Sequence, residues 1–479
     1  MMKIGSIING QERIEDNREI VAVHNPFNNE KVAELKLATK KDLEDAVTNS
    51  FEKFHSEMKV MPAHQRADIL RKAADLLVDK TEDFATIISK EAGKPIKYSR
   101  GEVERSIQVL RFASELAKNI PGEMIPMDAA IGGEHRMGLV KREPLGVVGA
   151  ITPFNFPLNL SLHKLAPALA AGNTVVFKPA EKTPISACML VKLFQEAGLP
   201  DGVINLLIGT GEEVGSALVT HDKVAKISFT GSLPVGKNIR ETAGLKKVTL
   251  ELGSNSPNLL FEDANIDYAT TELVKGAFAF SGQVCISAQR IYVHKEIYDS
   301  FLEAYIQKTK ALRMGDPISE ETDIGPMINE EEAKRAKEWI DDAVDKGARI
   351  AVGGERNGTI LSPTIMTDVD ENMKIIAEEV FAPIVSVIPF NTEEEAIEYS
   401  NDSIYGLQAG VFTRDINRAL RVADRLEMGG VWINEISTYR QDNHPYGGVK
   451  QSGVGREGVK YAIEDMTEMK FIGIKIDQN

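Results

Sequence analysis

The stretch from Phe280 to Ser287 places Cys285, one of two cysteines in the chain, among small and polar residues. Cysteine is the best intrinsic nucleophile among side chains, and it acts when it is accessible and its pKa is lowered. Gly282 lies three residues before it, and a glycine there lets backbone approach a ligand closely. A lone cysteine is more often structural, so this stretch indicates a nucleophile that the rest of the chain must support.

Two glycine-containing segments could hold a phosphate group. Thr230-Gly231-Ser232 follows a predicted strand and opens a predicted helix, whose free N–H groups favour an anion. The segment from Gly209 to Gly215 comes close to the dinucleotide-binding fingerprint, but it has one residue too many before its last glycine. The first segment is therefore the stronger candidate.

The pattern of apolar residues around these segments predicts an α/β protein. Between Val147 and Leu252, short apolar runs alternate with runs of helical period, and the same alternation returns between Arg290 and Ile433. Strands and helices that alternate at this spacing predict parallel sheets with right-handed crossovers. Ligands on such sheets bind at the carboxyl ends of the strands.

The remaining segments predict elements of other kinds. Residues 1–40 predict short strands and turns, and residues 39–118 predict helices whose charged residues face solvent. Residues 121–141 interrupt these helices, and composition fits a plain loop as well as an extension that pairs with another subunit. The tail from Glu468 to Ile476 predicts an edge strand that could join another sheet.

Composition limits the class of protein. The chain has 479 residues, 43% of them hydrophobic and 27% charged, which predicts a globular protein of two or three domains. A formal net charge of −15 argues against nucleic acid or an anionic membrane as the main partner. Two cysteines give neither a disulfide framework nor a zinc pattern, and no run predicts a signal peptide or a membrane span. We therefore expect a cytoplasmic protein without a bound metal.

Separated motifs, taken together and in order, resemble the aldehyde dehydrogenase superfamily from near residue 5 to near residue 470. They are Thr152 to Pro157, Phe177 to Glu181, Phe229 to Ser232, Glu251 to Gly253, Gly282 to Cys285, Glu378 to Pro383 and Pro445 to Gly453. Within the superfamily, the chain is similar to lactaldehyde-type and non-phosphorylating glyceraldehyde-phosphate-type enzymes, including the loop Arg440-Gln441-Asp442-Asn443.

The resemblance implies a mechanism with three catalytic residues. The Cys285 thiolate attacks the aldehyde carbon, and the Asn155 amide and the Cys285 backbone N–H hold the resulting oxyanion. Hydride transfer to nicotinamide leaves a thioester, and Glu251 activates the water that hydrolyses it. Without the resemblance, Glu251 would be read as an exposed turn residue and Asn155 as a turn former.

The resemblance also implies NAD as the cofactor, with NADP as the alternative. Lys178 and Glu181 match the contacts to the adenosine ribose, and a carboxylate there would repel a 2′-phosphate. Glu379 would bind the ribose on the nicotinamide side, and Phe381 would pack beside the nicotinamide. The full set of cofactor candidates is Thr152, Phe154, Lys178, Glu181, Gly211, Gly215, Thr230, Gly231, Ser232, Leu252, Glu379 and Phe381.

The substrate candidates are Arg440, His163 and His444. In the family, the loop of Arg440 borders the substrate mouth and His163 lies on the substrate-facing side. An arginine binds carboxylate, phosphate or sulfonate through two parallel hydrogen bonds, which favours a small hydroxylated or anionic aldehyde such as lactaldehyde. Val284 offers no charge to a phosphate. Alternatively, Arg440 forms a structural salt bridge, including one across a subunit contact.

Two departures from the family pattern keep other functions open. Ser254 follows Gly253 where the family has a second glycine, and Ala382 replaces the glycine of a Phe-Gly-Pro motif. The first alternative is an enzyme in which CoA takes the acyl group; Glu251 argues against it, because acylating relatives generally lack this base. The second is a non-enzymatic structural or binding relative, which the intact catalytic residues disfavour.

The resemblance implies a division into three parts. An NAD-binding domain would span 1–120 and 144–253, a catalytic domain 254–447, and an oligomerisation element 121–143 and 448–479. The expected assembly is a homodimer or a homotetramer.

Overall fold

A parallel sheet forms the centre of the first α/β part of the chain. The structure, a computed structural model, describes residues 2–476, so Met1 and the last three residues of the predicted oligomerisation element lie outside it. The sheet has the strand order β22-β12-β11-β8-β9-β10-β2-β3. Its strands are β2 (Ser6–Ile8), β3 (Gln11–Arg13), β8 (Val147–Ile151), β9 (Thr174–Lys178), β10 (Ile204–Leu206), β11 (Val224–Thr230), β12 (Lys247–Glu251) and β22 (Gly453–Val454).

The five strands from β12 to β10 pair in parallel, as the sequence predicts. Every residue of β8 and of β9 is buried, which explains their continuous apolar character. The strand β22 comes from the C-terminal part of the chain and pairs antiparallel with β12. The first sheet therefore includes a strand from the segment assigned by sequence to oligomerisation.

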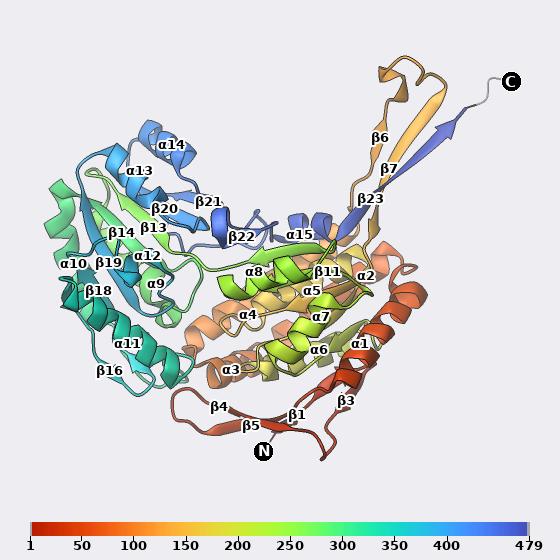
Figure 1. Cartoon of the computed structure of the whole chain (residues 1–479), viewed down its shortest axis with the longest axis horizontal. Helices are drawn as coiled ribbons and strands as arrows, with labels where there is room; N and C mark the ends of the chain where they lie inside the picture. Colours follow the sequence, from red (N-terminus) through yellow and green to blue (C-terminus); the bar gives the residue numbers. More distant parts are fainter. Residues whose placement is uncertain (1, 477–479) are drawn as a thin grey trace.

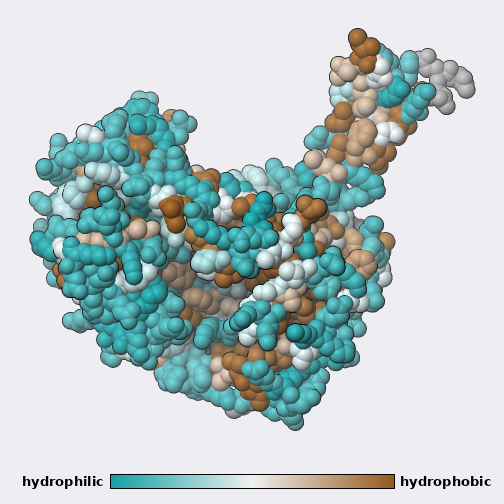
Figure 2. Space-filling view, in the orientation of Figure 1, coloured by the Kyte–Doolittle hydropathy of each residue, from teal (hydrophilic) through white to brown (hydrophobic). Residues whose placement is uncertain are grey.

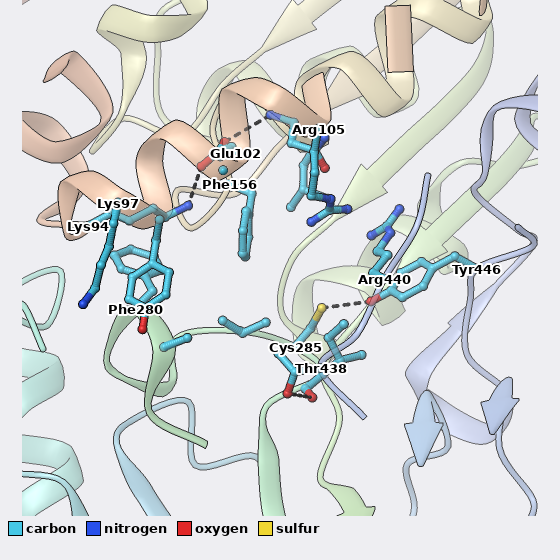
Figure 3. Close-up of a pocket in the computed structure, with 17 residues that line it drawn as sticks. Lys94, Lys97, Glu102, Arg105, Phe156, Phe280, Cys285, Thr438, Arg440 and Tyr446 are labelled. Atoms are coloured by element: carbon cyan, nitrogen blue, oxygen red, sulfur yellow. Dashed lines mark hydrogen bonds and ion pairs between the residues drawn. The ribbon is translucent and has the colours of Figure 1, made fainter. Parts of the chain in front are cut away.

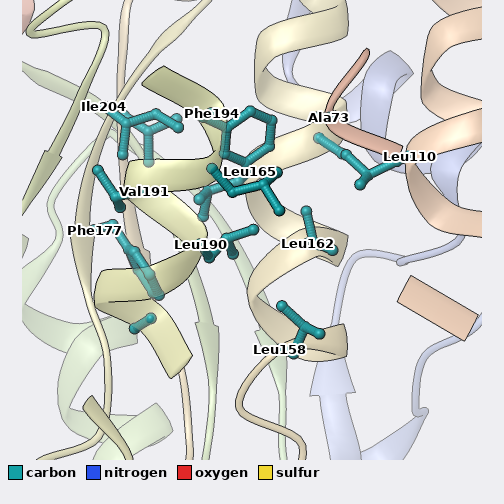
Figure 4. Packing of buried hydrophobic residues seen from close by; sticks show 14 of the residues in the cluster. Ala73, Leu110, Leu158, Leu162, Leu165, Phe177, Leu190, Val191, Phe194 and Ile204 are labelled. Carbon is teal, nitrogen blue, oxygen red and sulfur yellow. The ribbon is translucent and has the colours of Figure 1, made fainter. Parts of the chain in front are cut away.

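Helices cover both faces of this sheet, and their packing makes the largest hydrophobic core. They are α1 (Lys40–Lys53), α2 (Ala63–Asp79), α3 (Thr81–Ala92), α4 (Ile96–Ala117), α5 (Asn159–Ala171), α6 (Pro184–Glu196), α7 (Ser216–Thr220) and α8 (Leu233–Thr242). Figure 4 shows leucines of α5 facing Leu190 and Phe194 of α6. Full burial of one such side chain contributes about 1.5–3 kcal/mol.

All residues of the helix α5 are buried, so this helix lies inside the core. It ends at Gly172, which adopts the left-handed conformation (φ 93°) that commonly closes a helix, as the glycine at this position predicts. The helical segment between β10 and β11 begins irregularly. A π-helical turn, η3 (Gly211–Gly215), comes first and α7 continues it.

A second, mostly parallel sheet forms the other α/β part, with strand order β15-β18-β19-β14-β13-β20-β21. Its strands are β13 (Ser256–Leu260), β14 (Ala288–His294), β15 (Arg349–Val352), β18 (Thr364–Thr367), β19 (Ile384–Phe390), β20 (Gln408–Phe412) and β21 (Gly430–Ile433). Its helices are α9 (Ile266–Phe278), α10 (Tyr298–Lys310), α11 (Glu330–Asp345), α12 (Lys374–Ala377), α13 (Glu393–Asn401) and α14 (Ile416–Arg425). Together the two parts confirm the predicted α/β fold.

An arm of three strands projects from the first α/β part, on the side away from the second part (Figure 1). Strand β7 (Arg136–Pro144) pairs antiparallel with β23 (Thr467–Lys475) along its whole length, and β6 (Glu123–Ile125) flanks β7. The predicted extension and the predicted tail strand therefore pair with each other within one chain. Just before β23, α15 (Val459–Asp465) packs against α4 and α5.

Five minor strands form two further small sheets in the described chain. They are β1 (Met2–Ile4), β4 (Ile20–His24) and β5 (Lys31–Lys36) in one small sheet, and β16 (Arg356–Asn357) with β17 (Ile360–Leu361) in another. Each helix within residues 2–476 is too short or too polar to span a membrane.

Candidate active site

A left-handed turn sets the position of Cys285. The cysteine follows the short 3₁₀ turn η4 (Ala279–Gly282), in which Phe280, Ser281 and Gly282 have φ values of 49°, 55° and 67°. Left-handed conformations cost about 1–3 kcal/mol for residues other than glycine, so the surroundings must hold this turn. The Ser281 hydroxyl does so in part, because it donates to the Gly325 carbonyl oxygen over 2.7 Å.

Gly282 lets two backbone segments of the site approach each other closely. A Cβ at this position would lie 2.2 Å from the carbonyl oxygen of Ala382. The glycine therefore lets the Cys285 segment approach the backbone of the Phe381-Ala382-Pro383 loop, whereas the sequence suggested a close approach to a ligand.

Two cavities meet at Cys285. One has a volume of about 240 Å³ and is lined from α4 by Glu102 and Arg105 and from the C-terminal loops by Arg440 and Tyr446 (Figure 3). The other has a volume of about 350 Å³ and is lined by predicted cofactor residues. A nucleophile between two cavities can face one molecule on each side.

Asn155 lies in the loop between β8 and α5, in the second of these cavities. Its side chain is 4% exposed, and its amide nitrogen donates to the Gln283 carbonyl oxygen over 3.0 Å. This bond ties the loop of Asn155 to the backbone two residues before Cys285. The predicted partners Asn155 and Cys285 are thus brought together.

Glu251 ends β12 next to Thr230 of β11, and both of its carboxylate oxygens are buried without a hydrogen-bond partner among the described residues. Burial raises the pKa of Glu251 well above its usual value, and the nearby Glu457 raises it further. Arg440, Lys164 and Arg456 oppose this shift in pKa. A carboxyl group with free oxygens and a raised pKa is suited to proton transfer.

Glu457 is also a buried carboxylate, but in contrast to Glu251 it has hydrogen-bond partners and a lowered pKa. It accepts hydrogen bonds from Lys164 Nζ over 2.9 Å and from Arg440 Nη2 over 3.0 Å. Burial raises the pKa of Glu457, but the two cations outweigh burial and bring that pKa to about 2. Lys164 also donates to the Thr230 hydroxyl over 2.7 Å, so this cluster connects the first sheet to the C-terminal loops.

Tyr446 touches the nucleophile directly. Its hydroxyl oxygen lies 3.1 Å from the Cys285 sulfur, and the Arg440 guanidinium lies 3.6 Å from the centre of its ring. Burial raises the pKa of the Cys285 thiol to about 11, whereas the Tyr446 hydrogen bond and the charge of Arg440 lower it.

Several predicted cofactor residues lie along one edge of the first sheet, whereas Glu379 and Phe381 come from the second α/β part, between α12 and β19. Lys178 at the end of β9 pairs in register with Ile151 of β8, directly before Thr152, and Thr230 pairs with Glu251. This is the carboxyl edge where ligands of parallel sheets bind. The predicted residues that line the 350 Å³ cavity are Phe154, Thr230, Gly231, Ser232, Leu252, Glu379 and Phe381.

The other five predicted cofactor residues, which are Thr152, Lys178, Glu181, Gly211 and Gly215, do not line that cavity. Lys178 Nζ and Glu181 Oε1 form an ion pair of 3.0 Å, the alternative role that their spacing allows. A Cβ at Gly215 would lie 4.0 Å from the Lys178 side chain, which places Gly215 beside this pair. Gly211 opens the turn η3, where a Cβ would meet nothing within 4 Å.

The residues of the second cavity fit a nicotinamide dinucleotide. Thr230 and Ser232 precede α8, whose first N–H groups suit a phosphate. Phe154 and Phe381 stand edge to face with ring centres 6.0 Å apart and can pack on a flat ring. Glu379 accepts from the Ser254 N–H over 3.0 Å, and burial raises its pKa to about 7 against the effects of that N–H and of Arg335.

Ser254, the first departure from the family pattern, does not obstruct this cavity. Its side chain is buried, and its hydroxyl lies 3.3 Å from that of Ser256. Gly253 lines the cavity instead, and a Cβ there would lie 2.3 Å from Glu379. The position of the Glu379 carboxylate therefore requires a glycine at residue 253.

The three substrate candidates occupy different places. Arg440 lines the 240 Å³ cavity and forms its salt bridge with Glu457 of the same chain. His163 is buried with Nε2 2.8 Å from an Asp442 oxygen and does not line the cavity. His444 does not line it either; its ring packs edge to face with Trp432.

Sequence reasoning missed several residues of the 240 Å³ cavity. The expectation that charges of the helical region face solvent is wrong for Lys94 and Glu102, which are buried and form an ion pair. Arg105, three residues after Glu102 on the same helix, binds both oxygens of Asp442 over 2.6 and 3.2 Å. The sequence carries no local signal for this pair, because its members are 337 positions apart.

Comparison with known proteins gives one consistent result. The profile of the aldehyde dehydrogenase family matches residues 14–472. The chain is 47% identical to a 3-sulfolactaldehyde dehydrogenase of Priestia megaterium, covering 98% of each chain. It is 44% identical to a lactaldehyde dehydrogenase of Methanocaldococcus jannaschii, covering 95% of this chain and 97% of the relative.

Two solved structures share the fold along nearly the whole chain. Glyceraldehyde-3-phosphate dehydrogenase GapN from Methanocaldococcus jannaschii, complexed with NADP, has a TM-score of 0.92 and 43% identity, covering 96% of this chain and 100% of the other. Betaine aldehyde dehydrogenase from Staphylococcus aureus, in complex with NAD+, has a TM-score of 0.95 and 36% identity, covering 100% and 96%.

Proposed function

The chain belongs to the aldehyde dehydrogenase family, and we propose that it oxidises a small aldehyde bearing a hydroxyl or an anionic group to the carboxylic acid. NAD(P) is the acceptor, in line with the cofactors of its structural relatives. The relatives named for sulfolactaldehyde and lactaldehyde support this class of substrate.

The proposed class of substrate is supported by one hydrogen-bond donor of Arg440 that has no acceptor among the described residues. Its Nη2 is used by Glu457, but its Nε is buried without a hydrogen-bond partner among the described residues. Figure 3 draws the guanidinium groups of Arg440 and Arg105 within the cavity that contains the Cys285 sulfur. A buried N–H without an acceptor costs about 1–3 kcal/mol, which an anionic or hydroxyl group of the substrate would offset.

Three residues carry the proposed reaction. The Cys285 thiolate forms a bond to the aldehyde carbon, and the carbonyl oxygen becomes an oxyanion that accepts from the Asn155 amide and the Cys285 N–H. Bound NAD(P) would supply the hydride acceptor at this site, and loss of the hydride would leave the carbon bonded to Cys285 as a thioester. Glu251 then takes a proton from water, whose oxygen attacks the thioester and releases the acid and the thiol.

We propose NAD rather than NADP as the preferred cofactor. The Glu181 carboxylate next to Lys178 would accept from the ribose hydroxyls and repel a 2′-phosphate. Glu379, at the other end of the cofactor, would accept from the second ribose.

We also propose the three-part division of the chain, with residues 1–120 and 144–253 binding NAD, 254–447 supplying Cys285, and 121–143 with 448–479 mediating assembly. The exposed apolar residues of the arm support a homodimer or a homotetramer. They are Met124, Ile131, Met137, Met469, Phe471, Ile472 and Ile474, and Figure 2 shows hydrophobic residues along the arm. We further infer a cytoplasmic location, since two unpaired cysteines fit a reducing compartment.

The experiment is NADH formation by the purified full-length protein with lactaldehyde, sulfolactaldehyde, glyceraldehyde 3-phosphate, propanal and benzaldehyde. We expect the hydroxylated or anionic aldehydes to be preferred and Cys285→Ala to be inactive. Arg440→Met should lower kcat/KM for sulfolactaldehyde by about 10-fold or more, since a charge-assisted hydrogen bond contributes about 1.5–3 kcal/mol. Lys97→Met is the matched control, because this lysine lines the same cavity but is paired with Asp323.

Equal use of propanal and sulfolactaldehyde, with no selective effect of Arg440→Met, would refute the substrate class and leave the mechanism standing. Adding CoA tests the acylating alternative. Glu251→Gln should retain one turnover of NADH and lose steady turnover if water is the acceptor. A CoA-dependent reaction that survives in Glu251→Gln would instead identify an acylating enzyme.

A further inference from the structure

The motif Pro445-Tyr446-Gly447 supplies a group that the reaction above leaves unused. We infer that Tyr446 is a catalytic residue, whose phenol O–H donates a hydrogen bond to the Cys285 sulfur and stabilises the thiolate. The two atoms are 3.1 Å apart, within the 4.0 Å reach of a hydrogen bond to sulfur. The inference deepens the proposed function, because it concerns the same nucleophile.

The direction of this hydrogen bond follows from the chemistry of the two groups. A thiol can donate or accept, but a thiolate only accepts. Burial raises the pKa of Tyr446 well above its usual value, so the phenol stays protonated when the thiol ionises. In the ionisation, the S–H bond breaks, its proton goes to solvent water, and Tyr446 keeps its own proton.

Tyr446 is held firmly enough to act this way. Its N–H donates to the Glu457 carbonyl oxygen over 3.0 Å, and the Glu457 N–H donates back over 2.7 Å. The Arg440 guanidinium covers one face of the ring and is itself bound to the Glu457 carboxylate. Glu457 fixes the backbone of Tyr446, and Arg440 covers its ring. The Tyr446 hydroxyl is therefore held next to the Cys285 sulfur.

Other charges around the thiol do not replace this hydrogen bond. Arg440 favours the thiolate, whereas Glu379 and Glu251 disfavour it. The remaining charged residues of the cavity form ion pairs: Lys94 with Glu102, Lys97 with Asp323, and Arg105 with Asp442. Since burial opposes ionisation of the thiol, a donor at hydrogen-bond distance is the most direct source of stabilisation.

The test is the pH dependence of Cys285 alkylation by iodoacetamide, in full-length protein without aldehyde or cofactor. Peptide mass spectrometry follows Cys285 separately from Cys188. In Tyr446→Phe, which removes one oxygen atom, we expect the midpoint to rise by about one pH unit, because hydrogen bonds to charged groups are the stronger class. Tyr305→Phe is the matched control, since it removes a buried hydroxyl that donates to the Leu273 carbonyl oxygen, away from the thiol.

An unchanged midpoint in Tyr446→Phe, with melting temperature and NAD binding retained, would overturn the inference. A second reading is that the hydroxyl binds the substrate. That reading predicts a loss of kcat/KM for lactaldehyde but not for propanal, with the alkylation midpoint unchanged. The alkylation assay uses no aldehyde, so it decides the role of Tyr446 even if no aldehyde in the panel is oxidised.

Discussion

Three carboxyl groups around the candidate site, of which Glu251 and Glu457 are buried and Glu379 is half-buried, are pushed towards different protonation states. Lys164 and Arg440 keep Glu457 ionised against its burial, with a pKa of about 2. Glu251 and Glu379 lack a bound cation, and burial raises the pKa of both. Groups whose pKa values are driven apart by their surroundings can take separate roles. Glu457 is a fixed counter-ion, whereas Glu251 is the proposed base and Glu379 the proposed ligand for the cofactor.

The raised pKa of Glu379 predicts a pH-dependent affinity for NAD. A carboxylate accepts from both ribose hydroxyls, whereas a protonated carboxyl has lost part of that capacity. With a pKa of about 7 in the free protein, the group is mostly protonated at pH 6 and mostly ionised at pH 8. The affinity should therefore fall as the pH falls, by up to about 10-fold between these values.

Isothermal titration calorimetry with NAD at several pH values measures this affinity. Glu379→Gln is the control, and its weaker binding should not vary with pH. A pH dependence that persists unchanged in Glu379→Gln would assign the effect to another group.

Short sequence motifs identify the residues of the candidate site better than they identify the contacts between those residues. Cys285, Asn155 and Glu251 were predicted from short motifs. The structure places Cys285 and Asn155 in the lining of the 350 Å³ cavity, and Glu251 lies close enough to raise the pKa of the Cys285 thiol. The partners of Arg105 could not be predicted, because a charged residue in an amphipathic helix has the same pattern whether it meets solvent or a distant loop. Roles in the reaction remain predictions until the variants are measured.

The helix α4 links the two loops that carry the reacting groups. One oxygen of Glu102 accepts from the N–H groups of Leu158 and Asn159 over 2.9 and 3.1 Å, at the end of the Asn155 loop. The other oxygen binds Lys94. The Lys94 ammonium lies 3.7 Å from the centre of the Phe156 ring and 4.7 Å from that of Phe280, so it contacts both loops.

Glu102→Gln should destabilise the protein by about 3–5 kcal/mol, because it leaves the buried Lys94 ammonium without its counter-ion. Urea unfolding followed by circular dichroism measures the loss. Arg71→Ala is the control: it breaks an exposed pair with Asp75, and such pairs contribute about 0–1 kcal/mol. Adding Lys94→Met to Glu102→Gln should recover part of the stability, and a loss below about 1 kcal/mol in the single variant would refute the argument.

Helices and strands with a strong hydrophobic periodicity could be predicted from the sequence. A strand that contains turn-forming residues could not. The apolar runs of β8, β9 and β11 and the helix α5 stand where the sequence predicts them. Strand β13 was missed because Asn255-Ser256-Pro257-Asn258 is typical of a turn. Pro257 is accommodated at the register shift between Ser256 and Pro257, where its missing N–H interrupts the pairing with β14 least.

The arm is the feature of the whole molecule that a single chain leaves unexplained. Met469 and Phe471 of β23 are 61% and 54% exposed, and Ile472 and Ile474 lie on the alternate positions of the strand. Both faces of the arm therefore present apolar side chains to solvent in one chain. Sequence predicted the two strands separately, but their pairing needs contacts more than 320 positions apart.

We expect Phe471→Asp with Ile474→Asp to dissociate the proposed homo-oligomer, because two carboxylates would be buried in an apolar contact. Size-exclusion chromatography with light scattering gives the mass directly. Leu420→Asp is the control, since Leu420 is exposed to 58% on α14, away from the arm. A monomeric unaltered protein would remove the basis for this prediction.

The late position of one segment in the chain has a consequence for synthesis. Arg440, Tyr446 and the strand β22 all follow residue 439, yet the two side chains line the cavity of Cys285 and β22 pairs with the strand that ends at Glu251. Chains are made from the N-terminus at about 5–20 residues per second, and earlier parts begin to fold first. A ribosome-bound chain therefore displays its thiol without the arginine and the phenol that favour ionisation, and it gains full reactivity only after its last tenth has been released and docked.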